Sequence, residues 1–158
     1  MLPREDREYD VYKDSLLRYA GYANEVGEAF RLIVPVKFVW LSYAVSSGYV
    51  IADAIDKGYR VWKKPFQSEK ARFRRATIAT CDTLIWQGLA SVIIPGFTIN
   101  RICWLANRGL SMIEKFPPPA RKWTVAAIGL GSIPFIVKPI DRSVDFLMDN
   151  TFRRLYYR

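Results

Sequence analysis

Three long stretches of this sequence are apolar, although a quarter of all its residues are charged and its formal net charge is +9. They cover residues 32–51, 77–96 and 123–140, and each contains one charged side chain, Lys37, Asp82 and Lys138 respectively. A helix of about 20 residues spans the ~30 Å hydrocarbon core of a bilayer. A helix in a soluble protein needs polar side chains facing water at nearly every turn, and these stretches largely lack them. The sequence therefore predicts an all-α, multi-pass membrane protein with about three transmembrane helices.

The alternative is a soluble helical bundle with unusually apolar core helices. The stretches without any charge cover residues 38–52, 83–100 and 123–137. Only the second of these reaches the usual spanning length of about 18 residues. A chain of 158 residues that uses three spanning helices has no room for a large separate soluble domain. The membrane interpretation is therefore favoured.

The rest of the chain divides around these helices. We expect an amphipathic N-terminal helix within 1–31, transmembrane helices at 32–56, 77–96 and 123–140, a basic loop at 57–76, an interfacial helix and proline-rich turn at 97–122, and a tail at 141–158. The N-terminal helix is expected to lie on the membrane surface or pack on the bundle, and a partner-binding face is the alternative. The segment 97–116 has one strongly polar face, which favours an interfacial helix over a spanning one.

The composition argues against an enzyme. Histidine is absent, which removes the usual general base and the commonest metal ligand. The two cysteines, Cys81 and Cys103, have the spacing of neither a redox pair nor a zinc site. No motif identifies a catalytic residue, and we expect no metal and no cofactor.

Basic and aromatic residues alternate between residues 57 and 75, where Glu69 is the only acid. Such a pattern can bind nucleic acid, but beside a transmembrane helix it indicates contact with anionic lipid headgroups, and we expect no nucleic-acid partner. The residues expected to make this contact are Lys63, Lys64, Arg72, Arg74 and Arg75. The distribution of Lys and Arg favours this loop and the C-terminus on the synthesis or matrix side of the membrane.

Asp82 is costly inside a bilayer unless it faces a partner within the bundle. With an odd number of crossings, Asp82 and Lys138 lie toward the same membrane face. We therefore expect an intramembrane ion pair between Asp82 and Lys138 that joins the second and third apolar helices. A proton or ion pathway is the less favoured interpretation of the same residues.

Several strings resemble the mitochondrial fission process protein family, also called the mitochondrial 18-kDa protein family. These are Arg18-Tyr19 followed by GYANEVGEAFR at 21–31, ADAIDKG at 52–58, IPGFTINR at 94–101, RKW at 121–123 and PIDRSVDF at 139–146. They stand in the family's order and extend across nearly the whole chain. The segments 59–75 and 103–120 carry no recognised family string.

The resemblance implies a non-enzymatic, integral protein of the mitochondrial inner membrane that promotes mitochondrial division and affects organelle shape and cell survival. The alternatives are a scaffold for inner-membrane complexes that affects division indirectly, and, less favoured, a small carrier or channel. The family strings fall on helix ends and on the N-terminal helix. We expect a surface for inner-membrane proteins, or for self-association, at Tyr22, Asn24, Glu25 and Glu28; the alternative is that these residues only dock this helix on the bundle.

Overall fold

The structure is a computed structural model that describes residue 12 and residues 16–156. All regular structure in this part of the chain is helical, which confirms the predicted class. The elements in chain order are the 3₁₀ helix η1 (Leu16–Tyr22), α2 (Ala23–Ala29), α3 (Val36–Trp62), α4 (Glu69–Gln87), the π-helix η2 (Gly88–Ile93), α5 (Ile94–Ser111), α6 (Pro118–Asn150) and α7 (Phe152–Tyr156).

Three helical runs are long and apolar enough to cross a membrane, as predicted. They are Val36–Trp62, Glu69–Ser111 and Pro118–Tyr156. Prolines mark the start of two of them. Pro35 adopts an extended conformation directly before α3, and Pro117 does the same before α6, whose first turn contains Pro118. Proline is well suited to these positions because the first N–H groups of a helix have no intrahelical acceptor.

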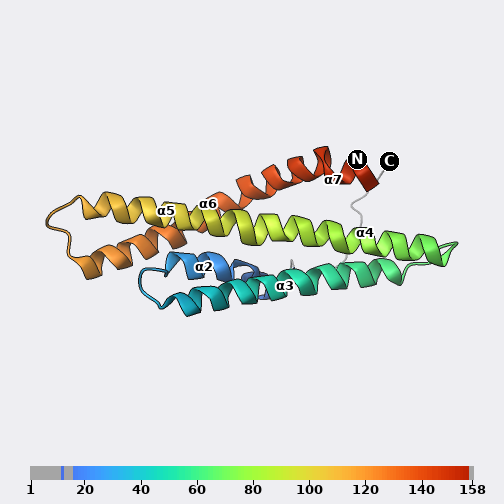
Figure 1. The fold of residues 1–158 in the computed structure, drawn as a ribbon, viewed down its shortest axis with the longest axis horizontal. Helices are drawn as coiled ribbons and strands as arrows, with labels where there is room; N and C mark the ends of the chain where they lie inside the picture. Colours follow the sequence, from blue (N-terminus) through green and yellow to red (C-terminus); the bar gives the residue numbers. More distant parts are fainter. Residues whose placement is uncertain (1–11, 13–15, 157–158) are drawn as a thin grey trace, which may run out of the picture.

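The second run is longer than the sequence predicts. An end is expected at Pro95 and Gly96, but α4, η2 and α5 form one continuous rod of 43 residues (Figure 1). The wider π-helical turns of η2 directly precede Pro95, where the missing N–H and the ring disturb the regular helical ladder. A 43-residue helix is about 64 Å long, so it extends beyond the ~30 Å hydrocarbon core.

α2 is an inner element of the bundle. It packs against α3, α5 and α6, and Figure 1 shows it beside the first half of α3. The core cluster beneath it contains Ala29 of α2, Ile99 and Cys103 of α5, and Val125 of α6. The N-terminal segment is therefore packed on the bundle, which is one of the two placements favoured from the sequence.

α6 connects the two core clusters of the described residues. Its first half packs into the cluster around Ile99, and its second half packs against Ala90 of η2 through residues that include Val144 and Met148. The close approach of α6 to α2 depends on Gly129, where a Cβ atom would lie 3.2 Å from the Cα of Ala29.

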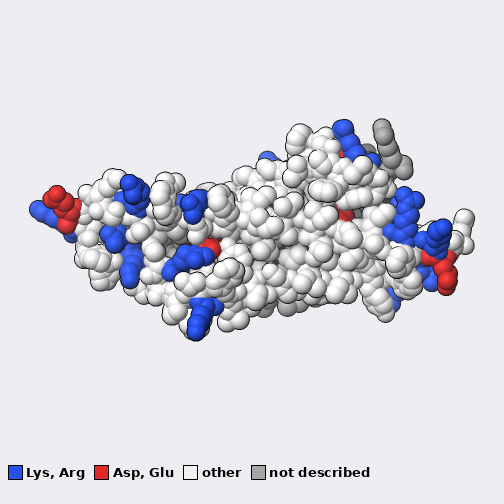
Figure 2. Space-filling view, in the orientation of Figure 1, with Lys and Arg blue, Asp and Glu red and all other residues white. Residues whose placement is uncertain are grey.

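Charged side chains gather at the two ends of the molecule. The face shown in Figure 2 has an uncharged belt between them, as expected for the part of a membrane protein in contact with lipid tails. Large apolar side chains that include Leu41, Val45, Phe97 and Phe135 are exposed. Exposed apolar residues at this density are unusual for a soluble monomer and suit a hydrocarbon environment.

Candidate functional site: the polar network around α2

The most polar part of the buried interior lies around α2. Three polar side chains of this helix are almost completely inaccessible to solvent. Asn24 and Glu25 have 0% exposure and Glu28 has 2%. Burying polar groups in this way is costly unless they are hydrogen-bonded. The hydrogen-bond partners of these side chains therefore show which elements α2 is attached to.

Asn24 connects α2 to two other elements. Its backbone N–H donates to Ser46 Oγ of α3 at 3.0 Å, and Ser46 Oγ donates to Asn24 Oδ1 at 2.9 Å. Its side-chain Nδ2 donates to the carbonyl oxygen of Val92, within η2, at 3.0 Å. One short amide side chain thus fixes α2 against α3 and against the π-helical segment of the long rod.

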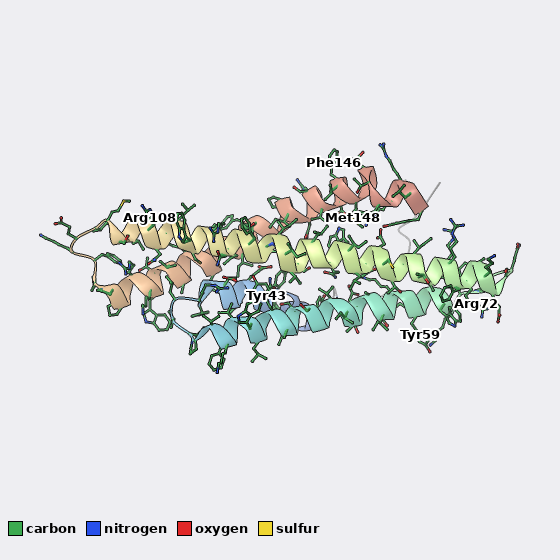
Figure 3. All side chains as sticks on the ribbon, viewed as in Figure 1. Tyr43, Tyr59, Arg72, Arg108, Phe146 and Met148 are labelled. Atoms are coloured by element: carbon green, nitrogen blue, oxygen red, sulfur yellow. The ribbon has the colours of Figure 1, made fainter. Side chains whose placement is uncertain are left out.

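Glu28 accepts four hydrogen bonds from three directions. Arg31 donates through Nε at 2.7 Å and through Nη2 at 2.6 Å. The hydroxyl of Tyr43 on α3 donates at 2.9 Å, and Nδ2 of Asn100 on α5 donates at 2.9 Å. Figure 3 shows Tyr43 on the side of α3 that faces α2. Burial acts to raise the pKa of Glu28, but the hydrogen bonds from Arg31, Asn100 and Tyr43 outweigh it, so the pKa lies below its ordinary value.

Glu25 is the opposite case. Its side chain is fully buried, and neither carboxylate oxygen has a hydrogen-bond partner among the described residues. Burial raises the pKa of Glu25 to about 8, and the negative charge of Asp141 on α6 contributes to the rise. Glu25 is therefore mostly protonated at neutral pH, because an unpaired charge at this depth would be strongly unfavourable.

A cavity of about 260 Å³ lies beside the N-terminal end of α2. Tyr22 and Asp141 line it, together with Tyr49 of α3 and Gln87 of α4. Gln87 also donates to Asp53 of α3 at 2.6 Å. The polar lining continues from the α2 network toward the other end of the bundle.

The structure places the four residues of the expected partner surface inside the protein. Asn24, Glu25 and Glu28 are buried, and Tyr22 is half-buried at the cavity. Their geometry is that of the docking alternative, because the hydrogen bonds of Asn24 and Glu28 are made within the bundle.

The structure brings Asp82 together with Arg153 of α7 instead of the expected Lys138. The Nε atom of Arg153 lies 3.1 Å from Asp82 Oδ1, whereas Lys138 is exposed on α6. Arg153 also contacts Asp145 at 3.4 Å and Asp149 at 2.8 Å. The reason is that α6 continues well past Lys138 to Asn150, so the turn after it brings α7 to the level of Asp82.

The five residues expected to contact lipid headgroups lie around the turn between α3 and α4. Lys63, Lys64, Arg74 and Arg75 are exposed and Arg72 is half-buried. Lys63 lies over the Tyr59 ring at 4.4 Å, and Arg72 lies over the Trp62 ring at 5.6 Å. Figure 3 shows Tyr59 and Arg72 at this end of the molecule. Basic groups held over aromatic rings beside the uncharged belt are well placed for anionic headgroups.

Sequence reasoning missed Tyr43, Asn100 and Arg153 as functional partners. Arg31 carried a weak signal, since an acid and a base three residues apart on a helix attract each other. Asn100 and Tyr43 carried none, because a single polar residue in an apolar helix does not identify the distant residue it meets. Among the described residues, no group of three or more Cys, Asp and Glu side chains could hold a metal ion.

Comparison with known proteins identifies a family. The sequence model of the family described as Mitochondrial 18 KDa protein (MTP18) matches residues 11–148. A human protein named mitochondrial fission process protein 1 is 56% identical over 149 residues, which cover 94% of this chain and 89% of the relative. Proteins of the same name from Danio rerio and Caenorhabditis elegans are 53% and 50% identical, each over 93% of this chain and over 88% and 89% of their own lengths. No solved structure matches significantly.

Proposed function

This chain belongs to the mitochondrial 18-kDa protein family, and from that premise we propose that it is a non-enzymatic, integral protein of the mitochondrial inner membrane that promotes mitochondrial division. The single observation that carries the proposal is the 56% identity to a mitochondrial fission process protein over 94% of the chain. At that identity and coverage, we expect the two proteins to share the same fold. An effect on organelle shape and cell survival belongs to the same proposal.

The bundle supports a role that needs no chemistry of its own. The buried carboxylate with the most contacts, Glu28, already accepts four hydrogen bonds, so its lone pairs hold helices together. Its pKa is lowered, which is unfavourable for a general base near neutral pH. The protein would then act on division through its surfaces, by binding lipids or other membrane proteins, or by self-association.

Lipid contact is proposed for the basic end of the α3–α4 hairpin. Lys63, Lys64, Arg74 and Arg75 are exposed there, and Arg72 is held against Trp62. Each Lys or Arg near an anionic membrane surface contributes about 1 kcal/mol of binding. An anionic leaflet would therefore stabilise this end and hold the hairpin at a fixed depth.

Protease protection tests the location. Mitochondria that contain the tagged chain are treated with protease when intact, after rupture of the outer membrane, and after detergent solubilisation. An inner-membrane protein is protected in intact mitochondria and resists carbonate extraction in all cases. Digestion of both ends in intact mitochondria would place the chain in the outer membrane and contradict this part of the proposal.

Complementation tests the activity. Cells that lack their own family member receive this chain, and mitochondrial length and the frequency of division events are measured by live imaging. We expect the wild-type chain to restore division. A variant with Lys63, Lys64, Arg72, Arg74 and Arg75 changed to Gln is expected to be folded but weaker. The control carries Lys37→Gln, Lys115→Gln and Lys122→Gln, which remove exposed charges elsewhere.

If the chain is a scaffold that affects division only indirectly, we expect a different order of events. In that case, loss of the chain would first change the migration of inner-membrane complexes on native gels, and division would change later. If division responds first, with the complexes unchanged, the direct role stands. If restoration of division fails although the protein is inserted and folded, the proposed function is wrong.

A further inference from the structure

A second basic site lies at the opposite end of the molecule from the α3–α4 hairpin. A pocket of about 160 Å³ opens between the C-terminal end of α2 and the surface of α5. Arg31 and Leu32 line it on one side, and Asn100, Arg101 and Trp104 line it on the other. Figure 3 shows Arg108, two turns beyond Arg101 on α5, toward this end of the rod.

The only acid in this pocket is already neutralised. Glu28 lines its base, but the carboxylate is 3% exposed and forms a bidentate contact with Arg31, with further hydrogen bonds from Tyr43 and Asn100. Its negative charge is paired with Arg31 and does not compensate the charge of Arg101. The positive charge of Arg101 therefore faces the pocket opening without compensation.

Arg101 is held in place by its neighbours on α5. Its Nε and Nη2 atoms donate to Asn100 Oδ1 at 3.2 and 2.7 Å. Its guanidinium lies over the Phe97 ring at 5.5 Å and over the Trp104 ring at 5.8 Å. Its third nitrogen, Nη1, makes no hydrogen bond within the described part of the chain. A guanidinium ordered in this way loses little side-chain entropy when it binds an anion.

Arg108 lies over the same Trp104 ring, at 6.0 Å. Neither Arg101 nor Arg108 forms an ion pair with an acid in the described part of the chain. Two guanidinium groups that share one indole ring repel each other. An anion bound between or beside them would relieve this repulsion and use the outward-facing donors of both.

The surface next to this pocket is apolar and exposed. Phe97 is 65% exposed and Trp104 is 51% exposed, and Ile93 continues the same row toward the uncharged belt. A tryptophan with cations beside it and apolar residues on its membrane side is typical of the headgroup level of a bilayer. Basic pockets between transmembrane helices at this level bind the headgroups of anionic phospholipids.

We propose that this pocket binds an anionic phospholipid, with the phosphate held by Arg101 at the pocket and by Arg108 beside it on the Trp104 ring, and an acyl chain lying over Trp104, Phe97 and Ile93. A free phosphate ion would use the cations but not the apolar row. The assignment does not depend on the role in division, because the contacts are local to α2 and α5.

Lipid titration of the full-length chain in neutral detergent tests this proposal. The probes are phosphatidylglycerol, phosphatidylcholine and inorganic phosphate, and bound lipid is counted by native mass spectrometry. We expect phosphatidylglycerol to bind the wild-type chain, and the Arg101→Gln/Arg108→Gln variant to bind it about tenfold more weakly. The matched control is Lys115→Gln/Lys122→Gln, which removes the same charge from exposed positions outside both proposed lipid sites and is expected to retain binding.

The outcomes separate the sources of the signal. Equal weakening in both double variants would mean a general charge effect, and equal binding of phosphatidylcholine would mean no headgroup selectivity; either overturns the proposal. Displacement of the lipid by inorganic phosphate at comparable concentration would also overturn it. If the double variant does not fold, Arg108→Gln alone is used, because the Arg108 side chain is exposed and its one contact among the described residues is with the Trp104 ring. Unchanged binding in that folded variant would contradict the role of Arg108.

Discussion

Asn100 donates a hydrogen bond to Glu28 at 2.9 Å across 72 positions of sequence, and this contact joins the short inner helix α2 to the long rod of α4, η2 and α5. The same carboxylate is contacted by Arg31 and by Tyr43 of α3. Glu28, like Asn24, therefore fixes α2 to two of the three long apolar helical runs.

Removal of this carboxylate should destabilise the bundle. Glu28→Ala leaves the donors of Arg31, Asn100 and Tyr43 without their acceptor, and we expect the free energy of unfolding to fall by about 3 kcal/mol. The measurement is unfolding in mixed detergent micelles followed by circular dichroism. The control is Val26→Ala on the same helix, whose side chain is 39% exposed; a similar loss in both variants would show that the polar contacts of Glu28 do not matter.

The close contact between α6 and α2 gives opposite expectations for two glycines. At Gly129 a Cβ atom would lie 2.7 Å from Cys103 Sγ and 3.2 Å from the Cα of Ala29, so Gly129→Ala should lower stability by about 1–2 kcal/mol. Gly131 has nothing within 4 Å of the corresponding position, and Gly131→Ala should raise stability by about 0.5–1 kcal/mol through helix propensity. The measurement is the thermal unfolding midpoint of the two variants. A change of stability in the same direction in both would contradict the packing of α6 on α2.

Glu25 should make stability depend on pH. The folded protein retains the Glu25 proton up to about pH 8, whereas an unfolded chain releases it near the ordinary value of 4.5. Between these values the folded state holds more protons than the unfolded state, so the free energy of unfolding falls as pH rises, by up to about 1.4 kcal/mol per pH unit. Above about pH 8 this contribution no longer changes.

The variant Glu25→Gln should remove this slope, because the amide does not titrate. Unfolding midpoints measured at intervals from pH 5 to 9 in the wild-type chain and in the variant provide the comparison. Glu28 contributes in a separate window, since its lowered pKa confines its effect to below about pH 4.5. A slope of the same size in both proteins would assign the titration to another group.

The pair of Asp82 and Arg153 predicts which charges hold the C-terminal turn. Asp82→Asn should lower stability by about 1 kcal/mol, a modest loss because Arg153 retains Asp145 and Asp149 as partners. Lys138→Ala should change it by less than about 0.5 kcal/mol, since Lys138 is exposed. Melting curves in detergent test both. A larger loss at Lys138 than at Asp82 would restore the pairing expected from the sequence.

The sequence by itself determined the class of fold and the presence of three long apolar helices, although not where each of them ends. Long apolar stretches with single charges are sufficient for this, because the cost of exposing polar backbone and charge in hydrocarbon acts on each segment separately. Family strings spread along the chain likewise identified the family without reference to any contact. The turn that ends at Pro117 was predictable for the same reason, since it follows from local backbone restrictions.

Only the tertiary structure decided which polar residues meet. Asn24 and Val92 are 68 positions apart, and Asp82 and Arg153 are 71 apart, and no local pattern encodes either pairing. The partner of Asp82 depended on how far α6 continues beyond Lys138, and the burial of Glu25 depended on α2 packing inside the bundle. Segment energies are additive along a sequence, whereas hydrogen bonds and ion pairs depend on the relative positions of helices, which are set by packing of the whole bundle.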